Sequence, residues 1–344
     1  MSAAVRASLV IVAYNSARHL PACLESLLPT LGATDEVLVV DCASTDGSAD
    51  VADGYPVRVV RSERNVGYGG GGNLGAARAA GRFLVFLNPD TVVEPGWLDA
   101  LLEPIATGPG LVTAKIVLYE DPDRIDASAN SVHLSGITVR RGHGQPAAGL
   151  GATERVLAVS GCVFAIDRAS FEHLGGFDER FFMYVEDTDL SLRAAVAGLP
   201  IWYAGRSRVR HNHLPAFRPG KLFWLERNRL SMLLKVWSTG TLLRLLPTVL
   251  FVELLTWAFA LRGGPTAVSA KARAWLWVLA NLPSVLARRR AVQRLRRVHD
   301  RELLRRCAWR LDLTELVGAP LVRRVAEAGL AVPLAACRLA LGRV

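Results

Sequence analysis

Five short apolar runs divide the first 210 residues of the chain, and more polar segments separate them. Continuous runs rich in Val, Leu and Phe predict strands that are buried on both faces. Between them, residues 17–31, 73–81 and 96–105 have helical patterns. Strands that alternate with helices indicate βαβ units, and therefore an α/β domain with a mostly parallel central sheet. The predicted strands are residues 8–14, 36–41, 57–60, 83–88 and 111–117.

Polar residues stand directly after three of these strands. Tyr14 and Asn15 follow the first strand, Asp41 ends the second, and Asn88 and Asp90 follow the fourth. Open sheets of this type bind ligands beyond the carboxyl ends of their strands. We therefore expect these five residues to lie at a ligand-binding edge.

The pattern changes near Pro215 to long helical segments rich in Leu, Trp and Arg. The most apolar segment, 245–261, is interrupted by Pro247 and Glu253 and is shorter than the roughly 20 residues that a spanning helix needs. A second apolar segment, 272–286, also contains polar residues and a proline, so neither predicts a transmembrane helix. Three arrangements stay open: helices packed on the first domain, helices lying in the membrane interface, or a shallow hairpin.

The net charge of +10 is concentrated in this helical region. Residues 241–344 carry 18 Lys and Arg against 6 Asp and Glu, a net charge of +12, and residues 1–240 carry −2. A nucleic-acid-binding protein would spread Lys and Arg over its recognition elements, so we expect no nucleic acid partner. Positive charge combined with apolar helices instead predicts an anionic membrane surface as a partner.

The cysteines and the amino-terminal residues indicate the compartment. The five cysteines form no C-x-x-C pair, which disfavours a zinc ribbon or a disulfide framework and favours a reducing compartment. The apolar run 9–13 is too short for a signal peptide. We expect a cytoplasmic location, at the inner face of the plasma membrane if the basic helices meet lipid.

The stretch VGYGGGGNLG at 66–75 fits two phosphate-binding patterns, and each fails at a definite point. Six residues separate it from the preceding strand, whereas a dinucleotide-binding turn follows its strand at once. Asn73 and Leu74 stand where a P-loop needs Lys and Ser or Thr. We expect a helix that starts near Asn73 as its N-cap. The glycines would then either approach a ligand or pack that helix closely on the sheet.

Two acidic stretches carry the candidate chemistry. FLVFLNPDT at 83–91 is a strand that ends in Asn-Pro-Asp, where a carboxylate can hold a divalent cation bridging two phosphate oxygens. Taken alone, this motif is just as easily a turn with a cap. YVEDTDLSLR at 184–193 reads as a helix start, in which Asp189 and Arg193 form an i,i+4 pair.

Five stretches taken together resemble glycosyltransferase family 2, in particular its bacterial rhamnosyltransferase-like members. They occur in the family's order and spacing and cover roughly residues 5–235. The resemblance implies a GT-A fold, a nucleotide-diphosphate sugar as donor, Mg²⁺ or Mn²⁺ as cofactor, and inversion at the transferred carbon. The stretches are SLVIVAYNS (8–16), VVDCASTDGS (39–48), RNVGYGGGGNLGAARAAG (64–81), FLNPDT (86–91) and YVEDTDLSLR (184–193).

The resemblance also implies where the donor and the metal would bind. Asp90 matches the metal-binding position of the family's D-x-D motif, in which Asn88 replaces the first Asp. A histidine after the E-D motif serves several members as a further metal ligand, and His211 matches it. The donor nucleotide would contact Ala13, Tyr14, Asp41, Asn65, Gly67, Asn73 and Asn88.

On the acceptor side, the family's E-D motif falls on Glu186 and Asp187. Asp187 would be the general base that takes the proton from the acceptor hydroxyl as it attacks the anomeric carbon. Glu186 and Gly161 would line the acceptor site. The segment 227–229 is a further candidate, for contact with acceptor phosphates.

The implied activity is an inverting transfer of a sugar, L-rhamnose in the first instance, from a dTDP or UDP donor. The acceptor would be a glycan or a polyprenyl-diphosphate-linked sugar in cell-envelope polysaccharide synthesis. The implied domains are a GT-A catalytic domain at 1–235 and a basic helical region at 236–344. Two alternatives stay open: a transferase acting on polyprenyl phosphate, whose usual D-A-D-x-Q motif differs from residues 88–92 here, and a catalytically silent binding protein of the same fold.

Overall fold

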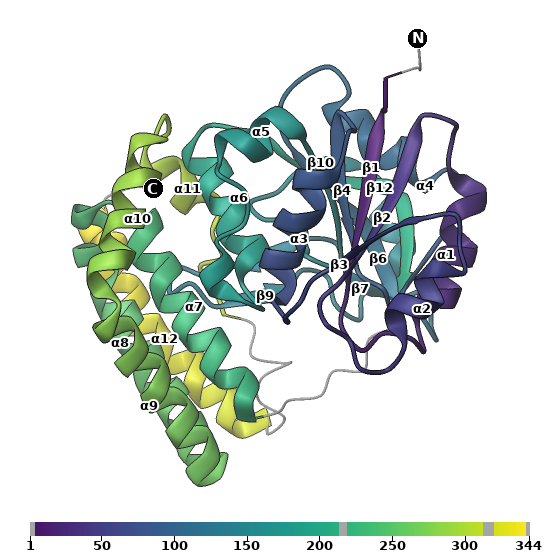
Figure 1. The fold of residues 1–344 in the computed structure, drawn as a ribbon. Helices are drawn as coiled ribbons and strands as arrows, with labels where there is room; N and C mark the ends of the chain where they lie inside the picture. The colour runs from purple at the N-terminus through teal and green to yellow at the C-terminus, as the bar shows by residue number, and fades with distance from the viewer. Residues whose placement is uncertain (1–3, 213–218, 312–319, 342–344) are drawn as a thin grey trace. The chain divides into compact units, whose positions relative to one another are not determined.

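The computed structural model describes residues 4–212, 219–311 and 320–341 (Figure 1). Its contacts divide the chain into two compact units. The first unit comprises residues 1–130, 140–194 and 199–215, and the second comprises 131–139, 195–198 and 216–344. The second unit includes the helix α7 (Pro219–Val236), and its longest segment begins close to the change in composition near Pro215.

A mixed ten-stranded sheet forms the first unit. Its main path runs in the order β10-β12-β6-β11-β4-β1-β2-β3, with β5 beside β12 and β7 beside β6. The strands β3, β2, β1 and β4 are parallel, but β11 is antiparallel to both β4 and β6. The sheet is therefore mixed: the prediction of parallel strands holds for β3, β2, β1 and β4 and for the pair β6 and β12, but not for the pairs that β11 forms. The strands are β1 (Ala7–Ala13), β2 (Asp35–Asp41), β3 (Arg58–Arg61), β4 (Phe83–Leu87), β5 (Thr91–Val93), β6 (Leu111–Leu118), β7 (Ile125–Ala127), β10 (Thr153–Arg155), β11 (Val163–Asp167) and β12 (Ile201–His211).

Helices cover both faces of this sheet (Figure 1). Alternate residues of β1 point to opposite faces: Leu9 and Ile11 share a buried cluster with α1 and α4, whereas Val10 and Val12 face α3. The apolar residues of β1 thus contact the helices on both faces of the sheet. The helices of this unit are α1 (Leu20–Leu27), η1 (Leu28–Thr30), α2 (Ser48–Asp53), α3 (Gly67–Arg78), α4 (Trp97–Leu102), η2 (Glu103–Ile105), η3 (Ala147–Gly149), α5 (Arg168–His173), η4 (Glu179–Phe181) and α6 (Glu186–Val196).

The glycine-rich stretch lies inside α3, which begins at Gly67. The expectation of a helix that starts near Asn73 is wrong, and Asn73 is not an N-cap. A Cβ at Gly71 would lie 2.6 Å from Cγ1 of Val12, and one at Gly75 would lie 2.3 Å from Cγ1 of Val10. The helix forms despite the poor helix propensity of glycine because the absent side chains let its backbone pack directly on β1.

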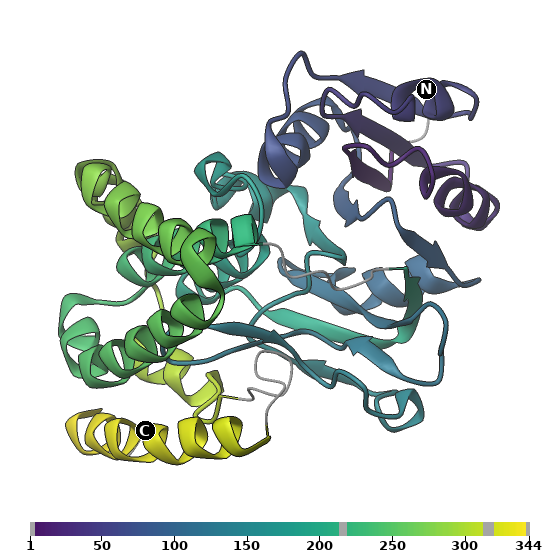
Figure 2. The ribbon, with the colours of Figure 1, turned by 90° about the horizontal axis from the view of Figure 1, so that it is seen from below.

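The second unit is helical. Its helices are α7, α8 (Thr239–Arg262), α9 (Gly264–Ala280), α10 (Leu282–Arg294), α11 (Asp300–Arg306) and α12 (Pro320–Leu341). Figure 2 shows α12, in yellow, beside other helices of this unit, and α8 packs against both α9 and α12. Two short strands near the division between the units, β8 (Asn130–Val132) and β9 (Thr138–Arg140), form a separate two-stranded sheet.

A buried cluster of four charges joins α7, α8 and α9. Arg229 of α7 pairs with Glu226 and with Glu253 of α8, and Lys271 of α9 contacts the same two carboxylates. Burial alone would raise the pKa of Glu226, but the two cations outweigh it and lower the pKa to about 2. Arg227 is also buried and lies over the ring of Trp224, 4.3 Å from its centroid. Arg227 and Arg229 thus contact residues of the helical unit, and the predicted contact of the segment 227–229 with acceptor phosphates stays a prediction.

Candidate active site

Asp187 stands in the first turn of α6, and donors on three sides hold its carboxylate. Its Oδ2 accepts hydrogen bonds from the backbone N–H of Gly161 at 2.7 Å and from Nδ2 of Asn130 at 2.8 Å. Its Oδ1 accepts from the N–H of Thr188 at 2.6 Å. Removal from water raises the pKa of Asp187 and outweighs these bonds, which lower it. The result is an oriented carboxylate with enhanced basicity.

The backbone before Asp187 is strained. Phe182, Tyr184 and Val185 all have positive φ angles of 60–70°, which side-chain-bearing residues rarely adopt. Such conformations cluster at functional sites, where the surrounding structure must hold them in place. Gly67 provides part of that support, because a Cβ there would lie 2.1 Å from the carbonyl oxygen of Phe182. The start of α3 thus packs against the segment that delivers Asp187.

Other residues of α3 hold the same segment. The side-chain amide of Asn73 accepts from the N–H of Phe177 at 2.9 Å and donates to Phe177 O and to Glu179, each at 3.0 Å. The hydroxyl of Tyr68 donates to the carbonyl of Gly161 at 2.7 Å. Asn73 and Gly67 therefore contact the chain that leads to α6. Their predicted contacts with the donor nucleotide stay predictions, as does that of Asn65, whose Oδ1 accepts from the N–H of Gly67 at 2.9 Å.

Glu186, beside Asp187, is in a different electrostatic state. Its side chain is buried, and its Oε2 has no hydrogen-bond partner among the described residues. Burial, and then the neighbouring charge of Asp187, raises the pKa of Glu186 well above its ordinary value. The E-D pair thus combines a buried carboxyl group, whose neutral form is favoured, with a carboxyl group that is more exposed and better hydrogen-bonded.

Asp90, Asp126 and His211 come together from three parts of the sheet. Asp126 of β7 and His211 at the end of β12 are joined by a 2.7 Å contact between Oδ2 and Nδ1. The other ring nitrogen of His211, Nε2, lies 3.4 Å from Oδ1 of Asp90. Arg140 pairs with the second oxygen of Asp126. The structure thus brings together the two residues predicted to hold a metal, and adds Asp126 behind them.

Charge interactions dominate this cluster. Burial lowers the pKa of His211, but its contacts with Cys162, Asp126 and Asp90 outweigh burial and raise the pKa well above the ordinary value. Burial raises the pKa of Asp126, but the hydrogen bond from His211 and the charges of His211 and Arg140 outweigh burial and lower the pKa below its ordinary value. The imidazole of His211 thus lies between two carboxylates, which favour its charged form.

The donor atoms of Asp90 and His211 fit a hard divalent cation. Carboxylate oxygen and imidazole nitrogen suit Mn²⁺, and Mg²⁺ is commonly held by one or two carboxylates together with substrate phosphates and water. Among the described residues, no group of three or more His, Cys, Asp and Glu forms a complete metal cage. Ligands from a bound diphosphate and from water would therefore have to complete the coordination.

The two halves of the site meet at the start of β11. Gly161 donates its N–H to Asp187, and the side chain of the next residue, Cys162, contacts His211. The carbonyl of Cys162 accepts from the N–H of Asn88 at 2.9 Å. The carboxylate of Asp187 and the Asp90–His211 pair are thus anchored through two consecutive residues.

A third group of residues lies where β1 and β2 end. The N–H of Cys42 donates to the carbonyl of Ala13 at 2.9 Å, and Asn15 and Ala43 have positive φ angles of 51° and 58°. Asp41 is buried, and its Oδ1 has no hydrogen-bond partner among the described residues. Tyr14 is 46% exposed. A buried carboxylate oxygen beside an exposed aromatic ring can bind a ligand with hydroxyl or N–H donors and a flat face.

Sequence motifs did not point to Asp126, Asn130 or Tyr68. All three bond to residues far away in the chain, and Asp126 is 85 residues from His211. The one available signal for Asp126 was an acidic residue within the short apolar strand Ile125–Ala127. Such a buried charge requires a partner.

The protein has a GT-A fold. Solved structures with this fold include GalNAc-T7 with UDP, GalNAc and Mn²⁺, with a TM-score of 0.59 and 20% identity over 72% of this chain and 52% of that one. The mannosyltransferase PcManGT of Pyrobaculum calidifontis, in complex with GDP-Man and Mn²⁺, gives a TM-score of 0.51 at 18% identity over 97% of this chain and 86% of that one. At these identities the likeness concerns the fold.

The chain belongs to glycosyltransferase family 2. The family model, described as glycosyl transferase family 2, matches residues 8–175. The N-acetylglucosaminyl-diphospho-decaprenol L-rhamnosyltransferase of Mycobacterium tuberculosis is 33% identical over 230 residues, which are 59% of this chain and 75% of that protein. The O-antigen biosynthesis protein RfbC of Myxococcus xanthus is also 33% identical, over 45% of this chain and 13% of its own length.

Proposed function

We propose that this glycosyltransferase moves a sugar from a nucleotide-diphosphate donor to a hydroxyl group in a single inverting displacement. The observation that carries the proposal is the anchoring of Asp187 and of the Asp90–His211 pair by the consecutive residues Gly161 and Cys162. One-step displacement needs a base at the acceptor and charge stabilisation at the leaving diphosphate. The site offers a group for each role.

Asp187 is the proposed general base. Its Oδ2 already accepts two strong hydrogen bonds, whereas Oδ1 accepts one short bond, from the N–H of Thr188, and a long contact of 3.3 Å from Oγ1 of Thr188. Oδ1 is therefore the atom that would receive the proton of an acceptor hydroxyl. The raised pKa of the carboxyl group brings its basicity closer to that required for this transfer.

Asp90 and His211 are the proposed holders of Mg²⁺ or Mn²⁺. When bound, the cation would neutralise charge that develops on the departing nucleotide diphosphate. Asp126 would keep the His211 ring oriented through Nδ1, which leaves Nε2 directed toward Asp90. At the ends of β1 and β2, Tyr14 and Asp41 would bind the base and the ribose of the donor.

The substrates are proposed from the relatives. The M. tuberculosis protein is named as a rhamnosyltransferase acting on a diphospho-decaprenol-linked sugar. We accordingly propose L-rhamnose from a dTDP or UDP donor and a lipid-linked or glycan acceptor, used in cell-envelope polysaccharide synthesis. Such an acceptor would place the protein at the cytoplasmic face of the plasma membrane.

A panel of nucleotide sugars tests the proposal. The full chain is incubated with Mn²⁺, each donor and a lipid extract, and both nucleotide release and product mass are measured. We expect one donor to give nucleotide release and a product heavier than the acceptor by one sugar residue. Failure of every nucleotide sugar to give hydrolysis or transfer would refute the enzymatic function and favour a silent binding protein.

A further inference from the structure

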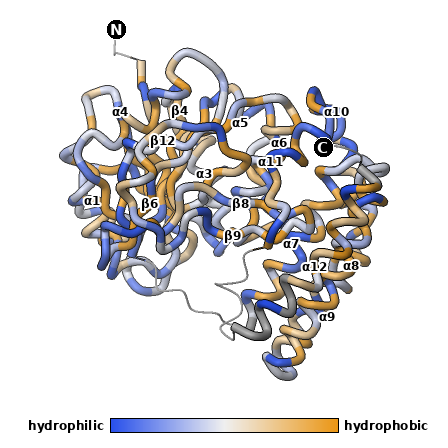
Figure 3. The backbone as a smooth tube through the Cα atoms, turned by 180° about the vertical axis from the view of Figure 1, so that it is seen from behind, coloured by the Kyte–Doolittle hydropathy of each residue, from blue (hydrophilic) through white to orange (hydrophobic). Residues whose placement is uncertain are grey.

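The outer face of α8 exposes a continuous row of apolar side chains. Five leucines, called here the leucine stripe, are 45–69% exposed to solvent. Their spacings of 3, 4, 4 and 7 residues place them on one side of the helix over about 27 Å, at about 1.5 Å per residue. Figure 3 shows long hydrophobic stretches, in orange, in this part of the helical unit. The leucine stripe consists of Leu243, Leu246, Leu250, Leu254 and Leu261.

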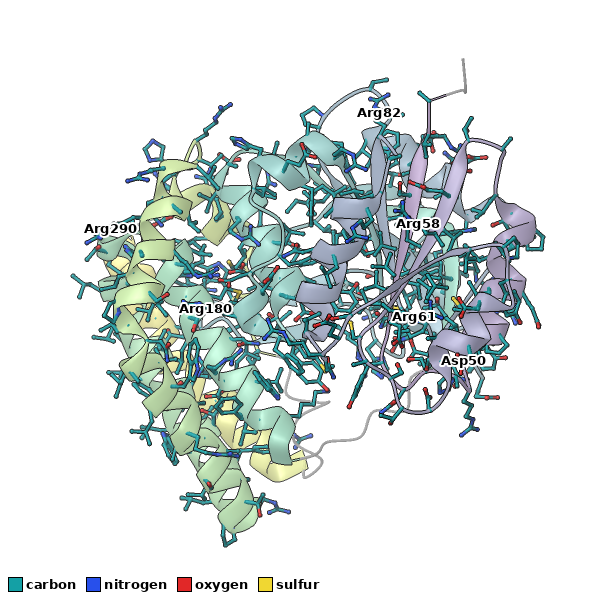
Figure 4. The ribbon with its side chains drawn as sticks, in the orientation of Figure 1. Asp50, Arg58, Arg61, Arg82, Arg180 and Arg290 are labelled. Carbon is teal, nitrogen blue, oxygen red and sulfur yellow. The ribbon has the colours of Figure 1, made fainter. Side chains whose placement is uncertain are left out.

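The exposed charged residues of α8, α9 and α10, all of which the structure describes, are positive. Between residues 227 and 299 the chain has a single acidic residue, Glu253, which is buried against Arg229 and Lys271. Arg290 lies at the outer edge of the helical unit in Figure 4. The exposed basic residues of α8, α9 and α10 are Arg244, Arg262, Arg273, Arg290 and Arg294.

We propose that the leucine stripe docks on an anionic lipid bilayer, with α8 lying in the membrane interface. An apolar helix face, on a bundle whose helices α8, α9 and α10 expose cations and no carboxylate, is complementary to acyl chains beneath negatively charged headgroups. The inference extends the proposed function, because a lipid-linked acceptor would reside in the same bilayer, but it does not require that function.

The structure favours a helix lying in the interface over one that crosses the membrane. Within the described residues, α8 is the one helix that is long and apolar enough to span a bilayer, with 24 residues. Its Glu253 forms the buried charge cluster with Arg229 of α7 and Lys271 of α9. A spanning α8 would have to carry this carboxylate into hydrocarbon or bring both cations with it, which is costly. In the interface, the leucine stripe meets lipid and the cluster stays intact.

Vesicle co-sedimentation of the full chain tests the surface. Phosphatidylglycerol–phosphatidylcholine vesicles should bind the protein, and binding to pure phosphatidylcholine should be weaker. The double variant Leu250→Gln/Leu254→Gln should lose at least about tenfold in vesicle affinity, because two exposed side chains no longer enter the acyl region. The control Leu250→Met/Leu254→Met keeps the apolar surface and should bind like the wild type.

A second pair of variants isolates the charge. Arg262→Gln/Arg273→Gln should weaken binding to the anionic vesicles and reduce its dependence on salt. Arg58→Gln/Arg61→Gln removes the same charge from exposed positions on β3, which Figure 4 labels, and should leave binding unchanged. Circular dichroism confirms that each variant is folded.

Four outcomes would overturn the proposal. The first two are no vesicle binding by the wild type and unchanged binding by Leu250→Gln/Leu254→Gln. The third is self-association of the wild type, without vesicle binding, that this variant abolishes. The fourth is retention of the protein in carbonate-washed membranes, which would show a spanning helix. Hydrolysis of the donor sugar in solution is measured separately and needs no membrane. A wild-type protein that hydrolyses the donor but binds no vesicles would therefore refute the docking surface and leave the proposed enzyme standing.

Discussion

Substitution of Gly71 by alanine tests whether the glycines of α3 serve packing. The new Cβ would lie 2.6 Å from Cγ1 of Val12 and 2.9 Å from Sγ of Cys42, both of which are buried. Overpacking of this kind costs about 1–3 kcal/mol, and the better helix propensity of alanine returns up to about 1 kcal/mol. We therefore expect the free energy of unfolding to fall by about 1–2 kcal/mol.

Urea denaturation followed by far-ultraviolet circular dichroism measures this change. Gly149→Ala is the control in the same unit, because a Cβ at Gly149 meets no atom within 4 Å. Its effect should stay within about 0.5 kcal/mol. A Gly71→Ala protein as stable as the wild type, with weakened binding of the nucleotide sugar, would contradict the packing argument and restore a ligand-binding role for the glycines.

Three further predictions concern the site. Asp126→Asn should weaken Mn²⁺ binding about 10- to 100-fold in calorimetry with nucleotide diphosphate present, since the His211 ring loses its carboxylate partner; unchanged affinity would count against this. Gly67→Ala should lower the transfer rate more than donor binding, because it displaces Phe182, which precedes the proposed base Asp187; the opposite split in steady-state kinetics would support a donor contact at Gly67. Because folding raises the pKa of Glu186, this residue contributes stability that is fully present below its unfolded pKa near 4.5 and is lost as pH rises through the folded pKa. Glu186→Gln should therefore flatten the pH dependence of the free energy of unfolding. An unaltered profile would argue against a raised pKa.

The apolar pattern predicted the strands whose own sequence is almost wholly apolar. The runs at 83–88 and 111–117 correspond closely to β4 and β6, because both strands are almost wholly buried. The reversal of β11 could not be read from the pattern, since its direction depends on pairing with strands that are distant in the chain. The start of α3 was misplaced because packing on β1 overrides the low helix propensity of its glycines.

The residues of the candidate site that belong to short sequence motifs could be predicted from the sequence. Asp90 and Asp187 stand in recognisable acidic stretches, and the structure brings His211 beside Asp90. Asp126 belongs to no motif, and its pairing with His211 spans 85 residues of sequence. Only the folded sheet shows that the imidazole has a carboxylate on each side.

The most direct test of the account compares Asp187→Asn with the wild type, using the donor that the nucleotide-sugar panel identifies. Sugar transfer to the acceptor and donor affinity in the presence of Mn²⁺ are measured on the same preparations. If Asp187 is the general base, transfer should fall by about a hundred- to ten-thousandfold while the donor Kd changes less than about twofold. Retained transfer by Asp187→Asn, with donor binding unchanged, would contradict the central claim.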